Sequence, residues 1–296
     1  MKIGLQIIEF DWPGGAPALA PALRDVAVAT EDAGYHSLWL MDHFFQMPGF
    51  GTGPDDPMLE CYTGLAYLAA HTSRIELGPL VSCVAYRHPG VLLKTATTLD
   101  VVSGGRSWLG LGAGWYDEEA VGLGVPWPTL ADRFRLLEDT LQLAHHTWRH
   151  GSRTPFKGSI VEVPVPVLSP PPVRTHGPRI LIGGTGERKT LRLLARYGDA
   201  SNLWVGRSPE RWTGSGLDDV RRWISVIEAH CADVGRDPAE IEHTAHATVD
   251  FSMCSDDDLR RLRDDLATVG VAYLIVNLMP RCEIDDVRRV ARAVLG

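Results

Sequence analysis

The sequence of 296 residues lacks a long apolar run and an excess of positive charge. No uninterrupted apolar stretch approaches the ~20 residues that a membrane-spanning helix needs, which argues against an integral membrane protein. The formal net charge of −8 argues against nucleic acid or an anionic membrane surface as a partner. The N-terminal stretch MKIGLQIIEFDW is too short in its apolar part, and too soon acidic, for a signal peptide, and it indicates a first strand.

Cysteines are few and scattered. Cys61, Cys83, Cys231, Cys254 and Cys282 lie far apart, and no two form a CxxC pair. An odd, dispersed set predicts reduced thiols in the cytoplasm, and neither a disulfide framework nor a zinc site. The eleven histidines show no HExxH or other metal-ligand spacing. We therefore expect a cytoplasmic protein without a metal.

Several catalytic signatures are also missing. The chain has no GxSxG nucleophile elbow, no Walker loop and no GxGxxG after its first strand. Serine hydrolysis therefore has no support, and neither does a nicotinamide site of the Rossmann type. Gly110-Leu-Gly112-Ala-Gly114 is superficially similar to a dinucleotide loop, but it lies within and at the end of a later strand.

Apolar segments alternate regularly with helical patterns along the chain. Eight strands are expected, at residues 2–10, 37–44, 75–85, 107–114, 178–186, 200–205, 241–251 and 271–278. Alternation of this kind calls for a parallel sheet, and eight strand–helix units in one chain favour a closed barrel. The predicted fold is thus α/β, a single (β/α)8 TIM barrel that occupies residues 1–296 as one domain.

One segment breaks the rhythm after the fourth predicted helix. Residues 149–173 contain five prolines in their final ten positions, which precludes a helix and disfavours a central strand. We interpret 149–173 as an insertion across one end of the barrel. With the Gly/Pro-rich loop 47–57, it is expected to rim a pocket.

The stretch from Arg74 to Trp115 predicts strand, helix and strand in succession. Its second strand closes on Gly110, Gly112 and Gly114, which remove side chains from one face so that a flat ring or another backbone can approach. In a β/α barrel, ligands bind at the C-terminal ends of the strands. The same glycines also suit a tight barrel corner, and their spacing favours neither interpretation.

Two other strand ends carry polar groups. Asp42 and His43 end the second strand, where the histidine could act as an acid or base or donate to a cofactor. Alternatively, the backbone satisfies His43 and Asp42 caps a loop. Gly183-Gly184-Thr185-Gly186 opens a predicted helix and suits an anion, although short glycine turns are common.

Two further segments are candidates of lesser weight. Arg87, before His88-Pro89, is interpreted as an ion-pair partner at the start of the third helix. The residues from Trp115 to Glu119 could supply an aromatic wall and acidic groups to a pocket. The same residues also suit a helix N-terminus, where acidic side chains are favourable.

Taken together, four motifs resemble the bacterial luciferase-like superfamily. They are Met-Asp-His at 41–43, Leu-Asp-x-x-Ser-Gly-Gly-Arg at 99–106, Leu-Gly-x-Gly-Ala-Gly-Trp at 109–115, and Gly-Gly at 183–184. Within it, the chain looks most like oxidoreductases that use the deazaflavin coenzyme F420. The resemblance covers nearly the whole chain and implies a barrel with an insertion, commonly a homodimer, holding coenzyme F420 or FMN at its C-terminal end.

The resemblance also assigns site residues. It implies a non-prolyl cis peptide in a bulge of the third strand, around Leu80-Val81-Ser82, that backs the ring of the coenzyme. His43, with Asp42, would lie near the reactive edge of that ring, and the segment Gly183–Gly186 would hold the phosphate-bearing tail. The cofactor-binding residues expected overall are Asp42, His43, Leu80, Val81, Ser82, Gly112, Gly114, Trp115, Gly183, Gly184, Thr185 and Gly186, of which Asp42 and His43 are also the candidate catalytic residues.

One departure from the family pattern bears on the substrate. The sugar-phosphate dehydrogenase of this branch has a glutamate directly after its glycine strand, where this chain has Trp115. We therefore expect an F420-dependent oxidoreductase that transfers a hydride between the coenzyme and a small organic substrate, with the substrate open. An FMN-dependent monooxygenase and a non-catalytic flavin-binding protein are the alternatives.

Overall fold

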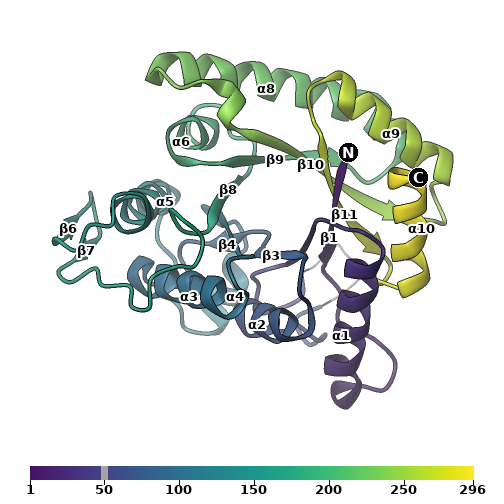
Figure 1. Ribbon diagram of the computed structural model, residues 1–296, viewed down its shortest axis with the longest axis horizontal. Coiled ribbons are helices and arrows are strands. Elements are labelled where there is room, and N and C mark those ends of the chain that lie inside the picture. The colour runs from purple at the N-terminus through teal and green to yellow at the C-terminus, as the bar shows by residue number, and fades with distance from the viewer. Residues whose placement is uncertain (48–52) are drawn as a thin grey trace.

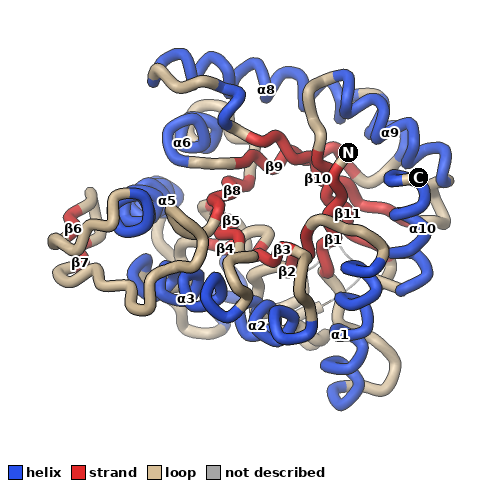
Figure 2. The backbone as a smooth tube through the Cα atoms, in the orientation of Figure 1, coloured by secondary structure: helices blue, strands red, loops and turns tan. Residues whose placement is uncertain are grey.

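Parallel strands form the wall of a closed barrel (Figures 1 and 2). The computed structural model describes residues 1–47 and 53–296. Its strands are β1 (Lys2–Ile7), β2 (Ser37–Leu40), β3 (Glu76–Pro79), β4 (Ser82–Cys83), β5 (Trp108–Gly112), β8 (Arg179–Gly183), β9 (Ala200–Gly206), β10 (Glu242–Asp250) and β11 (Tyr273–Met279). Their hydrogen-bonded order is β3-β2-β1-β11-β10-β9-β8-β5-β4.

The two ends of this order meet. Leu77 of β3 forms a parallel bridge with Ser107, directly before β5, and its amide donates to the Arg106 carbonyl at 2.9 Å. β3 and β4 are two parts of one barrel strand, interrupted by a cis peptide bond between Leu80 and Val81. The predicted (β/α)8 barrel is confirmed, and so is the cis bond expected around residues 80–82.

Helices surround the barrel on the outside (Figure 2). The long ones are α1 (Ala16–Asp32), α2 (Cys61–His71), α3 (Pro89–Val102), α5 (Leu130–Ala144, continued as one π-helical turn to Arg149), α6 (Thr190–Tyr197), α8 (Ser215–Val234), α9 (Asp256–Thr268) and α10 (Ile284–Leu295). Two short helices also form. For α4 (Asp117–Gly122), a helix N-terminus was one of the two interpretations of the sequence, whereas α7 (Pro209–Thr213) was not expected.

Local sequence explains where these helices begin. Pro89 starts α3, where its missing N–H costs nothing, and the His88 ring accepts from the Gly90 amide at 3.2 Å. Ser255 and Asp258 form a reciprocal capping box at the start of α9. Thr129 caps α5 by accepting from the Asp132 amide.

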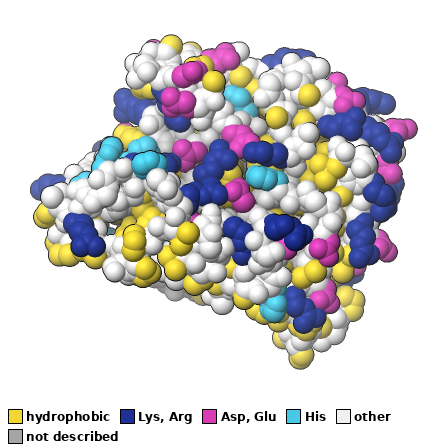
Figure 3. All heavy atoms as spheres, viewed as in Figure 1, with side chains coloured by type: hydrophobic (Ala, Val, Ile, Leu, Met, Phe, Trp, Pro, Cys, Tyr) yellow, Lys and Arg dark blue, Asp and Glu magenta, His cyan; other side chains and the backbone are white. Residues whose placement is uncertain are grey.

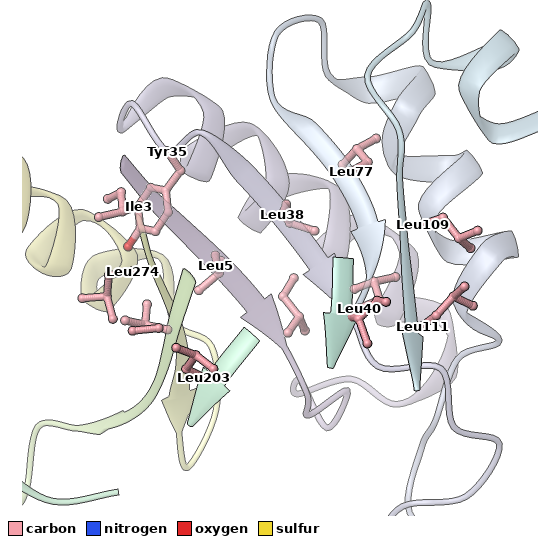
Figure 4. Close-up of a cluster of buried hydrophobic side chains, with 14 of the residues drawn as sticks. Ile3, Leu5, Tyr35, Leu38, Leu40, Leu77, Leu109, Leu111, Leu203 and Leu274 are labelled. Atoms are coloured by element: carbon pink, nitrogen blue, oxygen red, sulfur yellow. The ribbon is translucent and has the colours of Figure 1, made fainter. Parts of the chain in front are cut away.

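The core has two layers because side chains alternate along each strand. Leu38 and Leu40 point outward into a buried layer between barrel and helices, together with residues such as Leu5 and Leu109 (Figure 4). Trp39, between the two leucines in sequence, belongs to a separate inner cluster. That cluster also contains Trp108, Leu181, Tyr273 and Ile275. These large side chains fill the barrel interior toward the N-terminal ends of the strands, so a cavity can open only toward the C-terminal ends.

Ion pairs join the N-terminal ends of the strands. Glu242 accepts from Lys2 and from Arg179, each at 2.7 Å, and Glu76 pairs with Arg174 at 2.5 Å. Basic and acidic side chains are interspersed over the face drawn in Figure 3. This face therefore shows no broad patch of one sign.

The segment 149–173 lies against the outside of the barrel, beside α3 and α5 (Figure 1). It contains a short antiparallel hairpin of β6 (Phe156–Lys157) and β7 (Glu162–Val163). The Asp139 carboxylate of α5 accepts the amides of Ser159, Ile160 and Val161, which holds the hairpin turn. The hairpin is thus anchored to α5.

No helix among residues 1–47 and 53–296 has the length and apolar character needed to cross a membrane. All five cysteines lie in this described part, where they are buried and carry free thiols.

Candidate active site

A cavity of about 440 Å³ lies at the C-terminal ends of the strands. Ten of the twelve residues expected to bind the cofactor line it, namely His43, Leu80, Val81, Gly112, Gly114, Trp115, Gly183, Gly184, Thr185 and Gly186. Segments far apart in the sequence thus meet at one place. This position is the one that β/α barrels use for their ligands.

The Leu80–Val81 bulge packs directly against the glycine strand ends. A Cβ atom on Gly112 would lie 3.0 Å from Cγ2 of Val81, and one on Gly183 would lie 2.9 Å from its Cγ1. A Cβ on Gly110 would lie 2.1 Å from the Pro79 carbonyl oxygen. The glycines therefore make room for the bulge. For Gly110, the interpretation that the glycine is needed for close packing holds. Gly112 and Gly183 in addition leave one wall of the cavity without side chains.

His43 is held by Glu119, one of the acidic residues of the segment 115–119 that the sequence analysis considered for a pocket without choosing among them. Its Nδ1 atom lies 2.5 Å from Oε1 of Glu119, which is fully buried on the short helix α4. The Tyr86 hydroxyl donates to the same oxygen, and the Phe44 amide donates to Oε2 at 2.5 Å. A carboxylate can only accept, so Nδ1 of His43 carries a proton and Nε2 is the ring atom left to exchange protons in the cavity.

The electrostatics of this pair follow from its hydrogen bonds. Burial by itself raises the pKa of Glu119, but hydrogen bonds from His43, Tyr86 and the Phe44 amide outweigh that effect and bring the pKa below its usual value. Glu119 is therefore ionised at neutral pH. Burial, with Glu119 nearby, raises the pKa of Tyr86, which stays a neutral donor.

Asp42 and Ser82 are the two expected residues that do not line the cavity. Two guanidinium N–H groups of Arg87 donate to the Asp42 carboxylate, at 2.6 and 3.0 Å, and the pair is largely buried. The interpretation of Arg87 as an ion-pair partner is confirmed. Ser82 is fully buried and shares a hydrogen bond of 2.9 Å with the Tyr62 hydroxyl. Both side chains thus lie in a polar cluster beside the strand ends.

Polar side chains from β1, β10 and β11 line the far side of the cavity, and the sequence analysis missed them. Gln6 donates from Nε2 to the Leu80 carbonyl at 2.8 Å. Asn277 donates from Nδ2 to Gln6 Oε1 at 3.4 Å and to His246 Nε2 at 3.1 Å. Burial lowers the pKa of His246 to about 4, so this ring is neutral at pH 7. A polar residue facing inward near the end of a buried strand was the available signal.

The segment Gly183–Gly186 also lines the cavity, but the helix after it begins later than expected. The sequence predicted a helix directly after Gly186, whereas α6 begins at Thr190 after a turn over 187–189. Gly184 has a φ of 108°, a conformation that favours glycine. The Lys189 ammonium lies 4.9 Å from the centre of the Phe134 ring, which itself lines the cavity. The positive charge of Lys189 therefore lies beside the part of the cavity that Phe134 lines.

The predicted rim is only partly correct. Met47 lines the cavity, but residues 48–52 of the loop lie outside the described residues. The segment 149–173 supplies none of the lining residues found in the described part of the chain, so its predicted place over the pocket is wrong. Trp115 does form an aromatic wall, because it stacks on Tyr116 at a centroid distance of 5.3 Å and meets the His43 ring at 5.8 Å.

Comparison with known proteins places this geometry in a family. Residues 7–273 match the luciferase-like monooxygenases. The chain belongs to the luciferase-like monooxygenase family. The match spans nearly all of the barrel, so the resemblance seen in the sequence is confirmed.

The relatives and solved structures that are similar to this chain are named for differing activities. An F420-dependent glucose-6-phosphate dehydrogenase of Nakamurella multipartita is 32% identical over 216 residues, which are 72% of this chain and 61% of that protein. An F420-dependent secondary alcohol dehydrogenase in complex with an F420-acetone adduct has a TM-score of 0.77 at 16% identity, covering 99% of this chain and 98% of the other. A monooxygenase, RslO1 of Streptomyces bottropensis, has a TM-score of 0.76 at 18% identity, covering 99% and 97%. Both structural likenesses show the fold alone.

Proposed function

We propose that this chain is an oxidoreductase that uses coenzyme F420 and transfers a hydride between it and a small organic substrate. One observation carries the proposal. The Leu80–Val81 bulge, the glycine strand ends and a carboxylate-held histidine all line the same cavity. The relatives named as F420-dependent dehydrogenases support the choice of coenzyme.

The cavity residues fit a flat cofactor. The bulge with Gly112 and Gly183 gives a wall without long side chains, against which a ring system would lie. Gly184, Thr185 and Gly186 would hold the phosphate-bearing tail, with Lys189 nearby as a counter-charge. When bound, the deazaflavin supplies the hydride chemistry.

In this proposal, the side chains of the protein position the reactants and transfer the proton. Glu119 fixes the His43 ring with Nδ1 protonated, so that Nε2 can give a proton to the substrate, or take one from it, as the hydride moves. Trp115, Met41 and Met47 add apolar surface to this part of the cavity. Asp42 has no direct part in the reaction here, because its carboxylate is bound to Arg87 away from the cavity.

We further infer that the protein works in the cytoplasm as a homodimer. Size-exclusion chromatography with light scattering would test the homodimer.

The test of the proposal is a titration of the purified protein with coenzyme F420 and, separately, with FMN, followed by fluorescence quenching. Tighter binding of F420 is the expected result. Preference for FMN would instead assign the chain to the monooxygenases of its family. Binding of neither would indicate a non-catalytic member.

A further inference from the structure

One aromatic side chain at the cavity leaves most of its surface open. Trp115 lines the cavity and is 63% exposed. Its ring stacks on Tyr116 with an interplanar angle of 29°, so one of its faces is covered. The opposite face is therefore the one that is open to the cavity. An indole face left open at a ligand cavity is apolar surface that a bound molecule can cover.

Residues beneath Trp115 hold its ring in place. Tyr116 is only 5% exposed. It belongs to a buried cluster whose other members are Ile8, Met41 and Met47. The carbonyl oxygen of Tyr116 lies 3.2 Å from the hydroxyl of Tyr86, which is also buried. A flat surface that is fixed before binding loses little entropy when a ring stacks on it, and this favours affinity.

The open face of Trp115 lies beside the candidate acid–base group. The rings of Trp115 and His43 meet edge to face, with an interplanar angle of 65°. Both rings are held through the same neighbours, because Tyr86 contacts the Tyr116 carbonyl and also bonds Glu119, which holds His43. A molecule that stacks on Trp115 therefore lies next to the His43 ring.

A second exposed apolar side chain lies near Trp115. Leu130, the first residue of α5, lines the cavity and is 55% exposed. The Arg133 guanidinium donates to the Ala113 carbonyl at 3.0 Å, which ties the start of α5 to the segment that leads to Trp115. We call Trp115 and Leu130 the apolar rim.

The charges around the cavity limit what the apolar rim can bind. None of the described lining residues is Lys, Arg, Asp or Glu, and residues 48–52 are Pro, Gly, Phe, Gly and Thr in the sequence. The ionised carboxylate of Glu119 lies directly behind His43 and would repel an anion placed there. The Lys189 ammonium lies beside Phe134, where it is proposed to serve the coenzyme tail. An anionic group at the rim would therefore lack a counter-charge among the lining residues.

We infer that the apolar rim binds a flat, uncharged ring of the substrate, which stacks on the open face of Trp115 beside His43. Trp115, expected from the sequence to bind the coenzyme, is thereby assigned to the substrate. The inference rests on the proposed function for the coenzyme and for the part of His43. It names the substrate class as uncharged molecules with an aromatic or similarly flat ring, and sugar phosphates fall outside that class.

The test compares three ketones of similar size: acetophenone, cyclohexyl methyl ketone and the anion acetylbenzoate. Their binding is measured by calorimetry, without coenzyme and with oxidised F420. We expect the wild type to bind acetophenone about five-fold more tightly than cyclohexyl methyl ketone, because only the flat ring stacks on an indole face. Acetylbenzoate is flat but charged, and it should bind least.

Variants of Trp115 assign the preference to this side chain. Trp115→Leu keeps an apolar residue but removes the aromatic face, so it should bind acetophenone and cyclohexyl methyl ketone equally. Trp115→Phe restores an aromatic face and should regain most of the preference. Val121→Ala is the matched control, because Val121 is 68% exposed and does not line the cavity, and it should leave all three affinities unchanged. Circular dichroism confirms that each variant is folded.

The other outcomes separate this inference from the proposed function. Equal binding of the two neutral ketones by the wild type, no measurable binding of acetophenone, or a preference that survives in Trp115→Leu would overturn the inference. Affinity for F420 that falls more than about tenfold in folded Trp115→Leu would assign the ring to the coenzyme and also overturn it. If the protein binds no F420 while Trp115→Leu still abolishes the preference, the apolar rim stands and the proposed function fails.

Discussion

Nδ1 of His43 and Oε1 of Glu119 are 2.5 Å apart, although 75 residues separate these two positions in the chain. Glu119→Gln tests what this contact does. The amides of Phe44 and Phe45 would hold the new carbonyl oxygen, so the new NH2 group would face His43 and the ring would have to accept at Nδ1. We predict that the ring proton moves to Nε2, which nitrogen NMR of the histidine would detect.

The same variant should also slow catalysis. Acid–base catalysis by a positioned side chain contributes about 10²–10⁴-fold, and a wrong tautomer forfeits part of it, so kcat should fall at least about 10-fold. Affinity for F420 should change little. Tyr86→Phe is the matched control, because it removes one donor to Glu119 and leaves the His43 contact in place. Equal losses in both variants would count against the tautomer argument.

His43→Ala should reduce turnover much more than it reduces stability. The side chain is 13% exposed at the cavity and its loss opens no sealed void, so the thermal midpoint should shift by only a few degrees. Turnover should fall by about 10²–10⁴-fold. Steady-state rates and thermal melts on the same preparation give both numbers. Unchanged turnover would remove His43 from the mechanism.

Asp42→Asn should show the reverse pattern. Its carboxylate is fully buried against Arg87, and breaking a buried ion pair costs about 3–5 kcal/mol when one charge is left uncompensated. Glu60, 2.5 Å from Arg87, remains as a second partner, so we expect a loss at the low end of this range. Urea unfolding measures this loss. Asp285→Asn, which removes an almost fully exposed partner of Arg288, is the control and should change stability little. A stable Asp42→Asn protein with abolished turnover would restore a catalytic role for Asp42.

Glu9 makes stability depend on pH. Burial, aided by the nearby Asp11 and Asp56, raises the pKa of Glu9 from 4.5 to about 7. The folded state therefore binds the proton more tightly than the unfolded state, and stability falls as pH rises from 4.5 through 7. Glu9→Gln should raise the thermal midpoint at pH 8 by about 2–4 °C for each kcal/mol recovered, and by almost nothing at pH 4.5. An equal gain at both pH values would contradict this origin.

Much of the fold was predictable because its signals are local. Alternating apolar runs and helix caps located every barrel strand to within a few residues, and eight strand–helix units fixed the closed barrel. The helix α4 was only one of two interpretations, because Asp117, Glu118 and Glu119 suit a helix start and the wall of a pocket equally well. The hairpin in 149–173 was missed because its strands are two residues long.

The part of the candidate site that consists of the glycines and of His43 at a strand end could be predicted from the sequence. The role of Glu119 could not be predicted, because only the placement of α4 beside the segment 43–45 that follows β2 buries this carboxylate, while Glu118 stays exposed. Asp42 was expected in the site because it precedes His43, but adjacent residues near a strand end point to opposite faces. Gln6, His246 and Asn277 come together only when the barrel closes, which no local pattern reports.

The central claim is that the coenzyme lies against the wall formed by the Leu80–Val81 bulge and the glycine strand ends. Gly112→Ala tests it most directly, because the new Cβ would lie 3.0 Å from Val81 Cγ2 and would press the bulge into the cavity. The measurement is the dissociation constant of F420 for wild type and variant, by fluorescence titration, with circular dichroism to confirm the fold. We predict about a tenfold weaker affinity in a folded variant, which corresponds to about 1.4 kcal/mol. A folded variant that binds F420 as tightly as the wild type would contradict the account.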